Sequence, residues 1–460
     1  MSSDSVVTHV VAALAVVVAA SHALGALARR LGQPPVVGQL FAGIALGPSL
    51  LGLVPGGVYE TLFPSGIQPI LNALAQVALV FFLFAVGYEL DLGLLRGQRS
   101  VTSVSVSGFV VPMLLGAGIV LLLPGPFAAA NGDRPPDPTF VLYMAIALSI
   151  TAVPVLASII KDQGLAGTRP GTVAMASAGV IDALSWPVLA VVLVGGAHGS
   201  AREWGVKAAL LVLYVLVMLF AVRPLTARWI GRPGTPVSRQ VPVAVTVALA
   251  SAWATNALGL HVIFGALLAG VIMPRRPDGS PDGRLLRPLQ DTGGLLLPVF
   301  FAVSGMAVVL DGLHRSDLLL LAVIIAAAVV GKVASGALAA RAGRLPWRES
   351  LLIGVLLNTR GLTELIVLNV GLQAGVIGPR LYALLVVMAL VTTAAAGPLI
   401  RLLRHPSDAL PAPREGHRAG GSTPEIWSGP EAVQDPAPAV EHVPDQGPLP
   451  SPGGEPAPRA

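Results

Sequence analysis

The chain has 460 residues, of which 54% are hydrophobic and only 12% charged, and its formal net charge is +5. Soluble globular domains contain about 25% charged residues, so this composition excludes an ordinary soluble fold and predicts an all-α polytopic membrane protein. The absence of cysteine excludes disulfides, thiol chemistry and cysteine-based metal sites. We attribute the basic excess to loops that fix membrane orientation, not to nucleic-acid binding.

Apolar segments of about 17–25 residues recur along the chain, divided by Pro, Gly and Arg. The first is long enough to span a membrane and ends in Arg29 and Arg30, so we interpret it as a retained helix and not as a cleaved signal peptide. The eighth and ninth are separated only by Gly259 and its neighbours. The predicted spans number about thirteen: 6–28, 36–54, 69–90, 101–123, 139–160, 171–195, 205–225, 240–258, 260–274, 291–310, 316–340, 349–374 and 381–403.

Basic residues alternate between the predicted loops. With the N-terminus outside, nineteen Lys and Arg fall in inside loops, whereas only five fall outside, which is a positive-inside bias. The five are Arg134, Arg202, Lys207, Arg315 and Arg380. We therefore expect a multi-pass protein of the plasma (cell inner) membrane, with its N-terminus outside and its C-terminus cytoplasmic.

Two domains follow from this pattern. Residues 1–404 form the predicted transmembrane domain. Residues 405–460 hold thirteen prolines and almost no aliphatic periodicity, so they cannot bury enough apolar surface to offset their ordering entropy. We expect them to be a disordered, Pro-rich cytoplasmic tail.

Asp182 lies in the middle of the sixth predicted span. A charged side chain at the centre of a bilayer costs about 2.5–3.5 kcal/mol on insertion scales. Such a residue is retained where it serves an ion or proton pathway. Burial disfavours an ionised carboxylate and a nearby ammonium favours it. Asp182 is therefore the first candidate for a binding site at which a proton and a cation compete.

Two other spans have interrupted helical chemistry. In the fifth, Pro154 follows Ser149-Ile150-Thr151-Ala152-Val153 and removes a backbone donor. In the twelfth, Asn358-Thr359-Arg360-Gly361-Leu362-Thr363-Glu364 places polar residues and a glycine near mid-membrane. The two spans cross the membrane in opposite directions, because they are seven apart. Such a pair is typical of inverted-repeat secondary transporters with an ion site at the midplane; here the repeats would be spans two to six and nine to thirteen.

Charged side chains are expected beside these breaks, because helix ends carry partial charges. Lys332 lies deep in the eleventh span and either pairs with Asp182 or balances a helix end, although snorkelling to the interface is the alternative. Arg360 and Glu364 are four residues apart, so they either neutralise each other or cap the broken helix. Glu89, at the end of the third span, fits an interfacial position and is also a candidate pathway residue.

Several blocks then become recognisable. The Ala147–Ala157 segment with Lys161-Asp162-Gln163-Gly164-Leu165 resembles the broken-helix region of the monovalent cation:proton antiporter-2 family, which includes the Kef-type proteins. The sequences 345–349 and 358–369 resemble its plant-type cation/proton exchanger branch, and 84–91 and 298–306 match further family blocks in order. The resemblance covers about residues 10–404. It implies the sodium/proton antiporter fold, with two crossed discontinuous helices.

The resemblance also implies roles. Asp182 would exchange protons and cations, Thr151 would offer a hydroxyl or carbonyl to the ion, and Lys332 would be the core lysine. We add Ser149 to the ion ligands, and Asn358 and Ser185 to the candidate pathway with Glu89. Members commonly have Asn or Asp immediately before the carboxylate, whereas this chain has Ile181. That departure puts the usual stoichiometry and ion preference in doubt.

We therefore expect a secondary active antiporter that exchanges K⁺ or Na⁺ for protons by alternating access. The lipid bilayer and a second copy in a homodimer are its expected partners. No cofactor, no resident metal and no enzyme activity are expected, because no nucleotide loop, metal cluster or nucleophile arrangement occurs in the sequence. The alternatives are an efflux or channel-like transporter of another small cation on the same fold, and a transport-dead membrane sensor.

Overall fold

The structure is a computed structural model that describes residues 3–90, 99–195, 201–232, 235–258, 261–276, 279–308 and 314–403. Every regular element in these ranges is a helix, as the composition predicts. The tail predicted for residues 405–460 lies outside the described residues, so its disorder stays a prediction.

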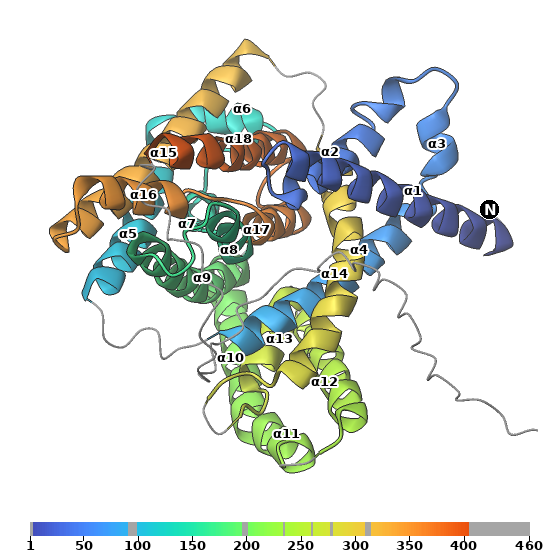
Figure 1. The fold of residues 1–460 in the computed structure, drawn as a ribbon. Coiled ribbons are helices and arrows are strands. Elements are labelled where there is room, and N and C mark those ends of the chain that lie inside the picture. The colour runs from blue at the N-terminus through green and yellow to red at the C-terminus, as the bar shows by residue number, and fades with distance from the viewer. Residues whose placement is uncertain are drawn as a thin grey trace, which may run out of the picture. The chain divides into compact units, whose positions relative to one another are not determined.

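The helices are shown in Figure 1. In chain order they are α1 (Ser3–Arg30), α2 (Pro35–Leu46), η1 (Leu51–Leu53), α3 (Val58–Leu62), α4 (Gln68–Glu89), α5 (Arg99–Leu122), α6 (Pro124–Ala130), α7 (Pro138–Ser149), α8 (Val153–Asp162), α9 (Arg169–Gly195), α10 (Ala201–Val217), the π-helical η3 (Met218–Val222), α11 (Arg223–Ile230), α12 (Val237–Ala257), α13 (Val262–Ile272), α14 (Gly283–Met306), α15 (Arg315–Ala342), α16 (Trp347–Leu357), α17 (Leu362–Gln373) and α18 (Pro379–Leu403).

Each of the thirteen predicted spans overlaps one or more helical elements. In the part of the chain that the structure describes, eleven helical stretches are long and apolar enough to cross a membrane. The remaining two predicted spans correspond to α12 and to the shorter apolar helix α13. The membrane character is thus confirmed, whereas a count of thirteen crossings stays a prediction.

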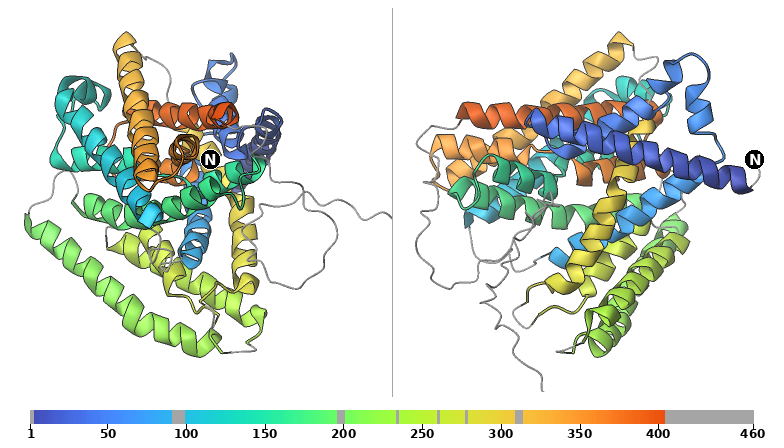
Figure 2. Two further views of the ribbon diagram at one scale, coloured as in Figure 1. Left: turned by 60° about the vertical axis from the view of Figure 1, so that its left-hand side comes forward. Right: turned by 45° about the vertical axis from the view of Figure 1, so that its right-hand side comes forward.

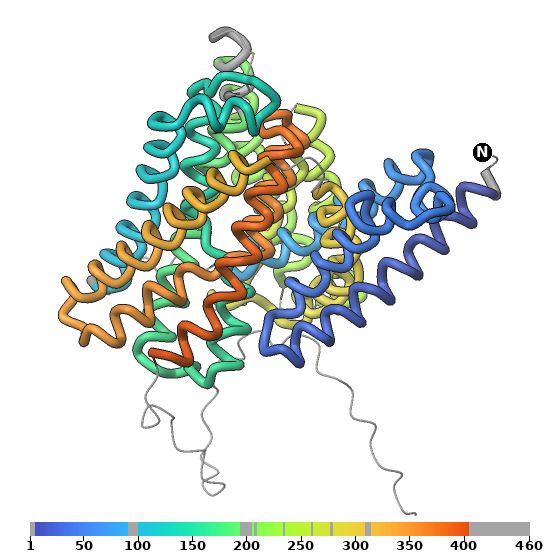
Figure 3. The backbone as a smooth tube through the Cα atoms, turned by 90° about the horizontal axis from the view of Figure 1, so that it is seen from above, coloured from blue at the N-terminus to red at the C-terminus, as the bar shows by residue number. Residues whose placement is uncertain are grey.

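Close helix contacts divide the structure into two bodies. We call α5–α9 together with α15–α18 the core body, and α1, α2, α4 and α12–α14 the panel body. The segment α10–η3–α11 joins α9 to α12. Within the described ranges, contacts between a core helix and a panel helix are sparse. In Figure 3 the orange α15 and α16 lie on the opposite side from the blue α1 and α2, and in both views of Figure 2 the orange helices lie away from the yellow-green α11 and α12.

Both predicted breaks are present, and both lie in the core body. α7 ends at Ser149 and α8 resumes at Val153, with Pro154 in its first turn, where a missing N–H removes no helical bond. α16 ends at Leu357 and α17 resumes at Leu362. Asp137 caps α7 at its other end, because its side chain accepts from Phe140 N at 2.7 Å. The sequence signals for interruption are therefore confirmed.

Glycines set the closest helix contacts of the panel body. A side-chain carbon on Gly87 of α4 would lie 2.1 Å from Leu267 O of α13, and one on Gly270 of α13 would lie 2.1 Å from Phe84 O of α4. These two helices therefore approach backbone to backbone, and small residues permit such approach between membrane helices. Substitution at either glycine must push the helices apart.

We expect Gly270→Val to destabilise the protein by about 1–3 kcal/mol or more, because overpacking forces the backbones apart. The matched control is Gly118→Val in α5, since nothing lies within 4 Å of a carbon placed on Gly118. The difference in melting temperature between the two variants is measured by heating the detergent-solubilised proteins and quantifying the remaining folded protein by size-exclusion chromatography. Equal melting temperatures for the two variants would contradict this packing.

Candidate functional site

The two breaks cross each other in the core body. The backbone N–H of Ala152 donates to Thr359 O at 3.3 Å, and Thr151 Oγ1 donates to Leu357 O at 3.1 Å. A side-chain carbon on Gly361 would lie only 2.5 Å from Val155 Cγ2, so glycine is needed for this close approach. The unwound segments thus satisfy part of each other's backbone. Irregular backbone at membrane depth is tolerated where protein covers it in this way.

The C-terminal end of α7 receives two cations. Lys332 Nζ of α15 donates to Gly108 O at 3.0 Å, to Thr151 Oγ1 at 2.7 Å, and also to Ser149 O. Arg360 donates from Nη1 to Ala147 O at 3.2 Å and from Nη2 to Leu148 O at 2.9 Å. Both side chains are fully buried. Since the last carbonyls of a helix carry partial negative charge, each cation compensates that end.

Arg360 is itself balanced by Glu364. Its Nη1 lies 2.6 Å from Glu364 Oε1, and both side chains are completely buried. Glu364 is in the first turn of α17, where the helix end carries partial positive charge. The Thr393 hydroxyl of α18 binds both backbone groups of Arg360: it accepts from Arg360 N at 3.1 Å and donates to Arg360 O at 2.6 Å.

Asp182 lies in α9, which packs against α7, α8 and α16 and so against both broken helices. Its side chain is 4% exposed. Oδ1 is buried and has no hydrogen-bond partner among the described residues. Within the same residues, no ion pair joins Asp182 to Lys332, which instead binds α7. Of the two roles predicted for Lys332, the structure therefore favours compensation of a helix end.

The N-terminal end of α8 lacks local compensation. Its first turn contains no acidic residue, and the cap residue Ala152 provides no side-chain acceptor. A free helix N-terminus attracts anions through its unpaired N–H groups and its dipole. Because α9 contacts α8, the carboxylate of Asp182 is the candidate counter-charge for this end.

Ile181, which precedes Asp182, is fully buried. A side-chain carbon on Gly108 of α5 would lie 3.3 Å from Ile181 Cδ1, so the isoleucine packs on α5 beside the carbonyl that Lys332 binds. The residue directly before Asp182 therefore makes an apolar contact with α5.

The other predicted site residues take different positions. Ser149 Oγ donates to Phe109 O at 2.7 Å, and Ser185 Oγ donates to Ile181 O at 2.7 Å, so both hydroxyls are engaged by backbone in this state. Asn358 is buried at the crossing, and its Oδ1 has no partner within the described residues. Thr151 bonds both to Lys332 and to the end of α16, which places it at the crossing itself.

Glu89 is exposed at the end of α4 in the panel body, where its Oε1 accepts from Gln290 Nε2 at 2.8 Å. Among the described residues, Glu89 makes no hydrogen bond or ion pair with the core body, so the structure does not place it at the crossing. Its interfacial position agrees with the sequence interpretation, and a pathway role stays a prediction.

Sequence reasoning missed the backbone acceptors at Gly108 and Phe109, and it also missed Tyr143. The Tyr143 hydroxyl of α7 donates to Val367 O of α17 at 3.0 Å and fills the space that a side chain on Gly371 would occupy. The sequence signal for this contact is a polar tyrosine, Tyr143, in an otherwise apolar span, together with Gly371 in α17, which leaves room for its ring. Carbonyl acceptors leave no signal in a sequence.

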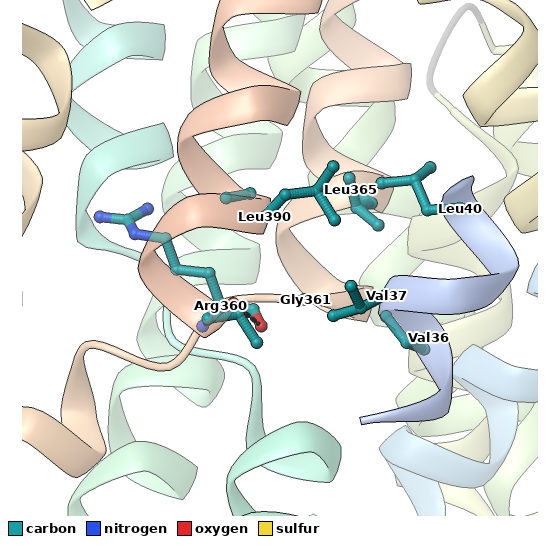
Figure 4. A pocket seen from close by; sticks show the side chains of 9 residues that line it. Val36, Val37, Leu40, Arg360, Gly361, Leu365 and Leu390 are labelled. Atoms are coloured by element: carbon teal, nitrogen blue, oxygen red, sulfur yellow. Dashed lines mark hydrogen bonds between the residues drawn. The ribbon is translucent and has the colours of Figure 1, made fainter. Parts of the chain in front are cut away.

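A small pocket lies where the twelfth-span break meets the panel body. Val36, Val37 and Leu40 of α2 face Gly361, Leu365 and Leu390 of the core body across it. Figure 4 shows the guanidinium of Arg360 pointing away from these apolar side chains. The pocket is thus an apolar part of the boundary between the bodies and offers no charged group to an ion.

The sequence profile described as "Sodium/hydrogen exchanger, transmembrane" matches residues 14–404, which is most of the chain. The chain belongs to the sodium/hydrogen exchanger family. Among the described residues of this exchanger-family protein, no three His, Asp or Glu side chains group together as a metal site would require.

Curated relatives agree with that membership. The chain is 34% identical over 401 residues to the Na(+)/H(+) antiporter NhaS4 of Synechocystis, with 85% of this chain and 96% of that protein covered. It is 35% identical over 410 residues to Cation/H(+) antiporter 20 of Arabidopsis thaliana, with 85% of this chain and 48% of that protein covered. The chain therefore spans about half the length of the plant relatives that it matches.

A yeast relative and a solved structure extend the comparison. The K(+)/H(+) antiporter 1 of Saccharomyces cerevisiae is 30% identical over 406 residues, with 85% of this chain and 45% of that protein covered. The sodium proton antiporter MjNhaP1 of Methanocaldococcus jannaschii superposes with a TM-score of 0.63 at 15% identity, over 86% of this chain and 99% of that one. The last likeness concerns the fold, and it confirms the predicted antiporter fold.

We expect Arg360→Leu to destabilise the protein by roughly 3–5 kcal/mol, because it leaves the buried charge of Glu364 uncompensated. Arg360→Leu with Glu364→Leu should recover a large part of that loss, since the buried charge is then gone. Thermal melting in detergent measures both variants, with the exposed Arg348→Leu in α16 as a control. A double variant as unstable as the single one would show that the loss comes from the carbonyls of Ala147 and Leu148, which Arg360 also binds, and not from the charge of Glu364.

Proposed function

We propose that this protein is a secondary active antiporter that exchanges a monovalent cation, K⁺ or Na⁺, for protons at Asp182. One observation carries the proposal. A carboxylate that is 4% exposed, with one oxygen lacking a hydrogen-bond partner among the described residues, lies on the helix that packs against both broken helices. A buried carboxylate in a membrane span marks an ion or proton pathway.

The names of the relatives support this reaction. They include a cyanobacterial Na(+)/H(+) antiporter, a yeast K(+)/H(+) antiporter and several plant cation/H(+) antiporters. Both Na⁺ and K⁺ occur among these names, so the proposal keeps both cations. The two share a single charge and a preference for oxygen ligands, which is the chemistry that Asp182 and Thr151 offer.

Competition for one carboxylate couples the two ions. Without a bound proton, Asp182 faces the cost of a buried negative charge, which either a proton or a bare cation removes. Because both neutralise the same group, only one is bound at a time. The N-terminal end of α8 helps to hold the ionised form between the two events, since α8 contacts α9 and its first turn contains no acidic residue.

The charges buried around the crossing are compatible with electroneutral exchange. Lys332 and Arg360 carry two positive charges, and Glu364 and Asp182 carry two negative charges when ionised. One bound proton and one bound monovalent cation give the crossing the same net charge. The two loaded states that cross the membrane are therefore electrically equivalent, and one-for-one exchange moves no net charge.

Alternating access completes the proposal. Transporters with crossed broken helices expose a midplane site to each side by moving one helix bundle against another. The sparse contacts between the core body and the panel body fit such a movement. We further propose a homodimer in the plasma membrane, with the N-terminus outside and the C-terminus cytoplasmic.

Asp182→Asn should abolish cation-dependent proton movement, because an amide cannot bind and release a proton near neutral pH. Everted vesicles with a pH-sensitive dye measure exchange after addition of NaCl or KCl. Asp162→Asn, the same change at the exposed end of α8, is the matched control and should retain exchange. Retained activity in Asp182→Asn would overturn the assignment of the site.

Exchange in proteoliposomes should be independent of membrane potential, since each cycle moves one positive charge in each direction. The measurement compares the proton flux at zero potential with the flux at a potential imposed by a gradient of a permeant anion. A flux that scales with the potential, or a current on a supported membrane, would contradict one-for-one exchange.

A further inference from the structure

The core and panel bodies are joined at one end of their boundary by a polar cluster around Gln373. Gln373 is the last residue of α17 in the core body. Gln76 of α4 donates from Nε2 to Gln373 Oε1 at 2.9 Å, and His261, directly before α13, has Nε2 at 3.2 Å from the same oxygen. One amide therefore links a core helix to two panel helices.

The orientation of the Gln373 amide is fixed by a fourth residue. Its Nε2 donates to Asn369 Oδ1 at 2.6 Å, one turn back in α17. Since the nitrogen is engaged there, the oxygen faces the panel body, and the His261 ring must carry its proton on Nε2 to donate to it. Both polar atoms of the Gln373 amide are thus engaged, whereas Gln76 Oε1 and His261 Nδ1 are buried without a hydrogen-bond partner among the described residues.

At the opposite end of the same panel helices, three hydrogen bonds lie within the panel body. Gln290 donates to Glu89 at 2.8 Å, Tyr88 to Pro274 O at 2.8 Å, and Arg275 to Leu90 O at 2.7 Å. The predicted topology places these residues on the cytoplasmic side and Gln373 on the external side. On the predicted cytoplasmic side the bodies are joined elsewhere, where Gln33 Nε2, between α1 and α2, donates to Ala394 O of α18 at 3.3 Å. The Gln373 cluster is the corresponding link at the predicted external end of α4 and α13.

We propose that Gln373, with Gln76 and His261, forms a polar latch that holds the external side of the transporter closed in this state. The latch breaks when the core body moves to open the site to the outside. This inference rests on the alternating-access part of the proposed function, and it assigns to these three residues a positioning role in the cycle.

The chemistry of the latch suits repeated opening. Its bonds join neutral groups, and Gln373 is exposed, so water can replace each partner when the bodies separate. No charge is left unpaired in either state. The free-energy difference between the closed and open states is then small, so a ligand or proton that favours the open state can shift the equilibrium.

Disulfide cross-linking tests the latch directly, because the chain has no cysteine of its own. Gln76→Cys with Gln373→Cys should cross-link on oxidation, stop cation/proton exchange, and regain exchange on reduction. The control is Asn131→Cys with Gly378→Cys, which joins two core segments at the same end, where Asn131 Oδ1 accepts from Gly378 N at 2.6 Å. That pair should cross-link without loss of exchange.

Each result of this experiment bears on the proposal. A Gln76–Gln373 pair that fails to cross-link, or that cross-links and still exchanges ions, would overturn the latch. Neither result would affect the assignment of Asp182, which depends on the separate Asp182→Asn measurement. Loss of exchange in the control pair as well would also overturn it, because inhibition would then not depend on linking the two bodies.

A second measurement asks whether the latch biases the equilibrium. In Gln76→Cys, the rate of labelling by an external, membrane-impermeant maleimide should rise about fivefold when Gln373→Ala is added, the factor expected for loss of one neutral hydrogen bond. Pro379→Cys, at the exposed start of α18 in the core body, should label at the same rate with and without Gln373→Ala. An unchanged labelling rate in the Gln76→Cys background would show that the bonds of Gln373 do not hold this end closed.

Discussion

The end of a helix in the middle of a membrane is the constraint on which this structure depends. α7 ends at Ser149, and its last carbonyls carry a partial negative charge at residues that are fully buried. The fold meets this constraint with two full cations, Lys332 and Arg360, whose donors reach the carbonyls of residues 147–149. Without them, a break in the fifth span would leave strong acceptors unpaired, and unsatisfied polar groups in a membrane are costly.

The placement of those cations decides what is left for Asp182. Lys332 is saturated by three oxygen acceptors, and Arg360 is shared between two carbonyls and Glu364. Neither cation is therefore available as a permanent partner of Asp182. Under the proposed exchange, a carboxylate locked in an ion pair would have to break that pair in every cycle, whereas Asp182 has no ion pair among the described residues to lose.

The sequence predicts the parts of this site that side-chain chemistry reveals. Pro154 and Gly361 mark the two breaks, and Asp182, Lys332 and Arg360 stand out as charges in apolar spans. What it could not predict is which groups meet. From the sequence, the partner of Lys332 could be either Asp182 or a helix end. Its partners are mostly backbone carbonyls, which every residue has and which therefore give no sequence signal. Arg360 acts on α7 as well as on its own helix neighbour Glu364, and only the crossing geometry shows this. Gln373 and Gln76 are 297 residues apart, and no periodicity links them.

The contacts at the boundary between the bodies differ in kind from those at the crossing, and the cost of burying charge accounts for the difference. At the crossing, Lys332, Arg360 and Glu364 are buried in an ion pair or against carbonyls, and removing one partner would leave an uncompensated charge. Such contacts hold a rigid unit together and are unsuited to a surface that must slide. The boundary instead carries apolar contacts, such as Leu40 facing Leu365, and neutral amides at its rim. A transporter that moves one body against the other needs this division, because the interactions that break in each cycle must be those whose loss water or lipid can replace.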